Sequence, residues 1–327
     1  VDRRQRQMCI RDRYMTVCQA MTGSGGWPMT ILMTPEQRPF WAGTYLPKMS
    51  TFRSTGLLEL LAFIREQWST NRQQLLNAGE EITNYLREQS GPSLGSAKPE
   101  LDLLRGAVAQ LSASYDSRWG GFGGAPKFPA PHNLLFLLRY SVLEREKSAQ
   151  SMAEYTLSQM FRGGLFDHIG GGFSRYSTDV KWLVPHFEKM LYDNALLAYT
   201  YLEAYAVTGR PLYRSVAKRT LDYVLRELTD EQGGFYCGQD ADSDGVEGKY
   251  YVFTPQEVQG VLGKEDGELF CSRFGVTEAG NFEGKSIPNL LDFSAYDEED
   301  PHIAQLCQRL YELSLIHISE PTRPERI

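Results

Sequence analysis

The tripeptide Gly171-Gly172-Phe173 occurs in two further copies, Gly120-Gly121-Phe122 and Gly233-Gly234-Phe235. Their phenylalanines lie 51 and 62 residues apart, which is about the length of a helical hairpin plus a loop. Such a period is typical of repeat architectures, so the sequence predicts long helices in pairs, joined by glycine turns, over residues 100–312. Residues 254–257, Thr-Pro-Gln-Glu, carry the signature of a capping box and predict one more helix start.

A different pattern precedes the repeats. An apolar run at 30–33, a turn at 35–38 and the segment 39–42 predict a β-hairpin. Four apolar residues then follow at helical spacing and predict a long amphipathic helix that packs on this hairpin: Leu57, Leu61, Ile64 and Trp68. The glycine- and serine-rich stretch 90–99 is interpreted as a linker. We therefore expect an α+β domain over 14–89 and a mostly α domain over 100–312.

Composition limits the classes of function. The chain has 327 residues, 42% of them hydrophobic and 23% charged, which is typical of globular proteins and excludes a disordered chain. The net charge of −7 argues against nucleic acid as a partner. The sequence contains no apolar run of about 20 residues and no pattern of a secretion signal, so we expect a soluble, cytoplasmic protein without a membrane partner.

Both ends of the chain have an unusual origin in this interpretation. Residues 8–12 and 313–319 can be encoded by nucleotide strings that are reverse complements over most of their length, and these strings resemble sequencing-library adapters. We expect 1–13 and 313–327 to be adapter-derived artefacts, the alternative being a basic arm and an unstructured tail. The cysteines in between lie far apart and form no Cys-x-x-Cys pair, which predicts reduced thiols, no metal site and no cofactor: Cys18, Cys237, Cys271 and Cys307.

Several long motifs together resemble a known family, that of YyaL and the spermatogenesis-associated thioredoxin-domain proteins. The motifs are Gly23–Thr30, Gly43–Tyr45, Gly123–Pro129, Pro185–Asn194 and Gln239–Ser243. The resemblance implies a thioredoxin-like domain followed by a six-hairpin α/α toroid of the glycosidase and N-acylglucosamine epimerase type. It also implies that the chain carries part of each domain and that the family's activity is not established. Its Cys-x-x-Cys segment is absent here, whereas Pro28 matches the thioredoxin-like cis-proline, so the first domain could still bind a protein partner.

The first candidate site is the segment 182–194. We expect His186 and Glu188 near the start of a helix and Asp193 about two turns into it, where a toroid would direct them into its funnel. Histidine is the side chain best suited to proton transfer near neutral pH. The alternative is that these side chains cap or brace the helix and its neighbouring loops.

The second candidate is a turn rich in carboxylates. Asp240 and Asp242 are predicted as a catalytic pair, because crowded carboxylates separate into an acid and a base, as glycoside hydrolysis requires. Asp244 and Glu247 are interpreted as solvated turn residues. The spacing also resembles a calcium loop, but Tyr251 occupies the position of the essential glutamate, so no metal is expected.

The third set lies on or beside the glycine turns and is predicted to bind substrate: Lys127, Asp167, His168, Arg175, Tyr176 and Trp182. Glycine lets the backbone approach a ligand, and aromatic rings can stack on sugar faces. The alternative is that these turns only join helices. The sequence thus predicts a toroid that binds or converts a carbohydrate-like small molecule by hydrolase- or epimerase-type chemistry, with a non-catalytic or redox-linked binding or scaffold protein as the alternative.

Overall fold

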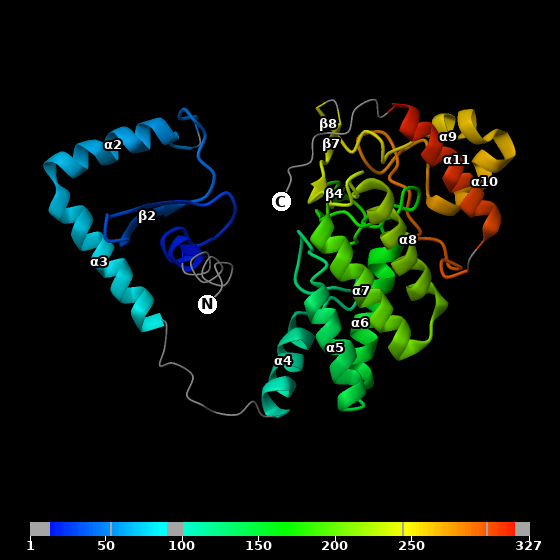
Figure 1. Ribbon diagram of the computed structural model, residues 1–327, viewed down its shortest axis with the longest axis horizontal. Coiled ribbons are helices and arrows are strands. Elements are labelled where there is room, and N and C mark those ends of the chain that lie inside the picture. The colour runs from blue at the N-terminus through cyan, green and yellow to red at the C-terminus, as the bar shows by residue number, and fades with distance from the viewer. Residues whose placement is uncertain (1–13, 53, 90–100, 244, 299, 318–327) are drawn as a thin grey trace. The chain divides into compact units, whose positions relative to one another are not determined.

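The computed structural model describes residues 14–52, 54–89, 101–243, 245–298 and 300–317 (Figure 1). The expected artefact at 1–13, the linker at 90–99 and Asp244 lie outside the described residues, as does 318–327. The chain divides into two compact units, 1–99 and 100–327. Each unit is described by itself.

The first unit is built on the predicted hairpin. Strand β1 (Thr30–Met33) pairs antiparallel with β2 (Pro39–Gly43), and the register places Ile31 opposite Ala42. A helical stretch over 14–22 precedes the hairpin, and the peptide bond between Trp27 and Pro28 is cis. The α+β character expected for this part of the chain is confirmed.

The prediction about the first unit's helix was wrong in one respect. Helix α2 (Leu57–Thr70) ends at Asn71, and a second helix, α3 (Arg72–Gln89), packs against β2. The core of the unit is formed by Leu86 of α3 with Ala42 and the helical stretch, whereas Leu61 of α2 is 44% exposed. Helical spacing identified α2 but could not show which helix covers the sheet.

The second unit contains helical hairpins, as the period of the glycine turns predicts. Among the described residues the hairpins are α5 (Pro131–Leu143) with α6 (Lys147–Arg162), α7 (Leu191–Thr208) with α8 (Pro211–Glu227), and α9 (Pro255–Leu262) with α10 (Lys264–Phe274). Helices α4 (Leu101–Ser114) and α11 (Pro301–His317) flank them. Helices α5 and α7 also contact each other. The predicted capping box is confirmed, because Thr254 and Glu257 cap the start of α9 reciprocally.

Short strands gather at one end of these hairpins (Figure 1). They lie in the segments that run from a glycine turn to the next hairpin: β3 (Tyr176–Ser177), β4 (Pro185–His186), β5 (Lys189–Met190), β6 (Gly238–Gln239), β7 (Asp242–Ser243) and β8 (Val246–Glu247). Strand β3 pairs with β4, β5 with β6 and β7 with β8. The pairing of β5 with β6 therefore connects the segments of two successive repeats.

Each glycine turn is capped by an aspartate a few residues before it. Asp167 accepts hydrogen bonds from the backbone N–H groups of Ile169 and Gly170, both at 2.9 Å. Asp116 and Asp230 do the same in the other two turns. In the second turn glycine is required at position 172, because φ is +79° and a Cβ atom there would lie 2.5 Å from the Tyr223 ring.

Two buried lysines clamp the first two turns. The Lys189 ammonium lies 2.7 Å from Asp167 and donates to the carbonyl of Gly171, and its side chain is 2% exposed. Lys127 makes the equivalent contacts with Asp116, at 2.5 Å, and with the carbonyl of Gly120. Burial alone would raise the pKa of Asp167, but Lys189 and the two backbone N–H groups outweigh it and hold that pKa below its usual value.

Removing one lysine should therefore destabilise the second unit strongly. We expect Lys189→Met to lower the free energy of unfolding by about 3–5 kcal/mol, because it leaves the Asp167 carboxylate buried without its cation. The control Lys218→Met removes an exposed lysine, paired with Asp222, and should cost less than about 1 kcal/mol. Urea unfolding followed by circular dichroism measures both. Equal effects of the two substitutions would contradict a structural role for the buried pair.

Candidate functional site

The candidate site is formed by the strands that follow the second glycine turn. Tyr176 on β3 lies directly opposite His186 on β4, with ring centroids 5.2 Å apart. The pairing continues past β3 and β4, because the Arg175 N–H donates to the carbonyl of Glu188 at 2.8 Å. The backbone thus places an aromatic ring, an imidazole, a guanidinium and a carboxylate side by side.

The start of the helix differs from the prediction. His186 lies on β4, and α7 begins only at Leu191, so Asp193 is in the first turn of that helix and not two turns into it. Because β4 and β5 are paired with β3 and β6, the chain stays extended up to Met190 and the helix begins after it. This is why His186 and Glu188 are presented by extended backbone at the helix entrance.

His186 is oriented by a carboxylate from another segment. Its Nδ1 lies 2.7 Å from Oε1 of Glu247 on β8, and its side chain is 31% exposed. A carboxylate only accepts hydrogen bonds, so the neutral imidazole carries its proton on Nδ1 and directs the lone pair of Nε2 elsewhere. This arrangement suits a general base.

Asp193 is a buried carboxylate at the entrance of α7. It is 9% exposed, and its Oδ2 has no hydrogen-bond partner. Burial raises its pKa to about 6, although Arg175 and a hydrogen bond from Tyr192 oppose the shift. Arg175 is itself held by Glu188, whose carboxylate lies 2.6 Å away. Asp193 can therefore exist in both protonation states near neutral pH.

Four predicted substrate-binding residues lie behind the site, in the core. Lys127 and Asp167 belong to the buried ion pairs, and Trp182 is fully buried and donates from its indole N–H to the carbonyl of Trp119. His168 is 2% exposed among phenylalanine rings, and burial lowers its pKa to about 3. Lys127 and Trp182 offer no surface to a ligand, which corrects the prediction that they bind substrate. For Asp167, which pairs with Lys189, and for His168, substrate binding stays a prediction.

The acidic turn adjoins the site through Glu247. Asp240 and Asp242 are exposed, and Asp240 accepts a hydrogen bond from the backbone of Asp242 at 3.1 Å. Asp242 lies opposite Glu247 in the pairing of β7 with β8. The residue interpreted as a solvated turn residue, Glu247, is thus the one that contacts His186.

The sequence reasoning missed several residues of this region. The capping aspartates had a readable signal, because Asp116, Asp167 and Asp230 each stand three or four positions before a Gly-Gly pair. No signal in the sequence pointed to Tyr192 or Glu247, because their contacts with Asp193 and His186 form only in the folded chain.

A cavity of about 420 Å³ lies apart from Asp193 and is lined in part by His168, Arg219, Arg273 and Cys307. Within the described residues no group of three His, Cys, Asp or Glu could hold a metal ion, and no helix is long and apolar enough to cross a membrane.

Comparison with known proteins agrees with the motifs. Residues 1–87 match the family model Thioredox_DsbH, a protein of unknown function (DUF255). Spermatogenesis-associated protein 20 from Homo sapiens is 42% identical over 88% of this chain and 39% of its own length, and the Mus musculus protein is 40% identical over 88% and 39%.

The chain is similar to these relatives over most of its own length. It spans about two fifths of the length of the curated relatives it matches. Its first unit is therefore thioredoxin-like. Among solved structures, the cellobiose 2-epimerase of Bacillus thermoamylovorans has a TM-score of 0.39 and 13% identity, covering 65% of this chain and 71% of that chain. The match to the thioredoxin-like family model and the helices of the second unit confirm the coarser form of the expected fold class, a thioredoxin-like unit followed by a mostly helical one.

The environment of Asp193 predicts a pH-dependent stability. Because its pKa is raised from 3.8 to about 6 in the folded protein, the stabilising contribution is complete below pH 3.8 and is lost as the pH rises through 6. Asp193→Asn should abolish this loss, so that the variant gains about 1–2 kcal/mol on the wild type between pH 4.5 and 7.5, a value reduced for partial solvent access. Denaturant midpoints across pH measure the gain. An equal gain in the control Asp222→Asn would contradict the assignment.

Proposed function

We propose that the helical unit binds a carbohydrate-like small molecule at the surface formed by His186, Asp193, Arg175 and Tyr176, and moves a proton on it. The observation that carries the proposal is that two different proton carriers adjoin the segment Arg175–Tyr176: His186 lies opposite Tyr176, and Arg175 acts on Asp193. His186 is half-buried and oriented by Glu247, whereas Asp193 is buried with a pKa of about 6. Two groups in contrasting environments are how one site supplies both an acid and a base.

The neighbours have complementary roles in this proposal. Tyr176 supplies a flat apolar face, partly exposed, against which a sugar ring can lie. Arg175 and Glu188 provide donors and acceptors for hydroxyl groups while holding each other in position. His186 accepts a proton through Nε2, and Asp193 in its protonated form donates one. Epimerisation and glycoside hydrolysis both need such an exchange. Asp240 and Asp242 adjoin the site, because Asp242 lies opposite Glu247, the partner of His186, and we propose that they contact the same ligand.

A sugar panel with two readouts tests the proposal. Incorporation of deuterium from D₂O into the sugar reports epimerisation, and release of reducing ends reports hydrolysis. We expect His186→Gln and Asp193→Asn each to lower the rate about 10²–10⁴-fold, the usual contribution of an acid or base. The control Asp102→Asn alters an exposed carboxylate in α4 and should keep full activity. Each variant is first shown to unfold with the wild-type cooperativity.

The outcome also separates the alternative function. Turnover that survives in both site variants would contradict the catalytic roles. Sugar binding without turnover would favour a binding or scaffold protein, in which the thioredoxin-like unit engages a protein partner. The cytoplasmic location stays a prediction.

A further inference from the structure

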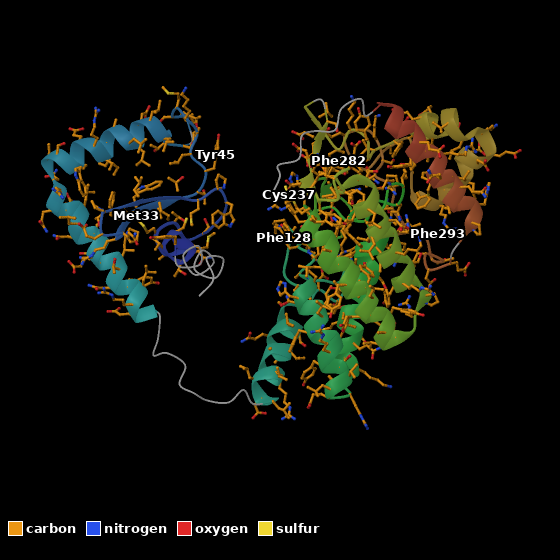
Figure 2. All side chains as sticks on the ribbon, viewed as in Figure 1. Met33, Tyr45, Phe128, Cys237, Phe282 and Phe293 are labelled. Atoms are coloured by element: carbon orange, nitrogen blue, oxygen red, sulfur yellow. The ribbon has the colours of Figure 1, made fainter. Side chains whose placement is uncertain are left out.

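We infer that the site takes a neutral ligand of at least two sugar rings, with the second ring bound on Phe128. The inference rests on the proposed function and extends it from a sugar to an oligosaccharide. It is carried by the exposed aromatic side chain of Phe128, which lies at the edge of the second unit (Figure 2) and contacts Tyr176 of the site.

Phe128 is exposed although its neighbours are fixed. Its side chain is 56% exposed, whereas Lys127 before it is 1% exposed and Pro129 after it is buried. The backbone is held too, because Lys127 and Ser177 exchange two hydrogen bonds of 2.8 Å. An exposed apolar side chain on a mobile loop would need no explanation. Here the backbone beside the ring is fixed by hydrogen bonds, which lowers the entropic cost of binding a ligand to the ring.

The ring continues the surface of the site. The ring centroids of Phe128 and Tyr176 lie 4.9 Å apart, with an angle of 32° between the ring planes. The ring centroids of Tyr176 and His186 lie 5.2 Å apart, also at 32°. The three rings form a row that leads from the proton carrier outward. A sugar held at His186 over Tyr176 would direct any further unit towards Phe128.

The surroundings of Phe128 define the chemistry of the second ring. The preceding loop, Gly123 to Pro126, is exposed and carries no charged side chain. The nearest cation in sequence, Lys127, is committed to Asp116 and two backbone carbonyls. The surface of Phe128 therefore suits the apolar face of an uncharged pyranose.

Isothermal titration of the full chain with mono- and trisaccharides tests the inference. The probes are glucose and mannose against cellotriose and mannotriose. We expect at least one trisaccharide to bind about tenfold more tightly than its monosaccharide, and Phe128→Ala to remove that advantage while leaving monosaccharide affinity unchanged. Phe128→Trp should restore it. The matched control is Phe63→Ala, since Phe63 is 55% exposed in the first unit.

Each result decides a different point. A trisaccharide advantage that persists in Phe128→Ala, or that is lost equally in Phe63→Ala, overturns the role of Phe128. Equal affinity for mono- and trisaccharides overturns the second ring but leaves the proposed function standing. Failure of every probe to bind the wild type overturns both. Thermal melts of the variants exclude loss of folding as the cause.

Discussion

The helical unit depends on the burial of two ammonium groups. Lys127 and Lys189 each neutralise the aspartate that caps a glycine turn and each donates to a carbonyl of that turn. A turn rich in glycine has few side chains with which to fix its own shape, so an ion pair in the interior supplies the rigidity. In the third turn, Asp230 accepts a hydrogen bond from the hydroxyl of Tyr236.

These clamps determine where functional groups can lie. Lys189 is on β5, directly after Glu188, and Lys127 directly precedes Phe128. In both places a buried lysine is adjacent in sequence to a residue whose side chain reaches the surface: Glu188 precedes Lys189, and Phe128 follows Lys127. The alternation of extended backbone makes this unavoidable, because neighbouring side chains point to opposite faces. The residues that stabilise the turns and those that meet solvent are therefore neighbours in sequence.

This alternation explains how much of the structure the sequence could predict. The period of the glycine turns predicted the hairpins, and the capping residues predicted the start of α9, because both signals are local. The site residues were predicted by type, and their places on or beside the glycine turns grouped Lys127 and Trp182 with Arg175 and Tyr176. In the structure Lys127 and Trp182 are buried, whereas Arg175 and Tyr176 are partly exposed. Burial depends on which face of an extended segment meets the core, and the residue type alone does not reveal that face. The contact of His186 with Glu247 joins residues 61 positions apart, so no local pattern could reveal it.

The same reasoning explains why Asp193 differs from the other carboxylates of the site. Glu188 has Arg175 as a direct partner, and Glu247 has His186. Asp193 lies in the first turn of α7, whose backbone already forms the helix, and its Oδ2 is buried without a partner. Burial makes ionisation of this carboxylate costly, and Arg175 and Tyr192 offset that cost only in part, so its pKa stays raised. Asp193 can therefore bind or release a proton near neutral pH.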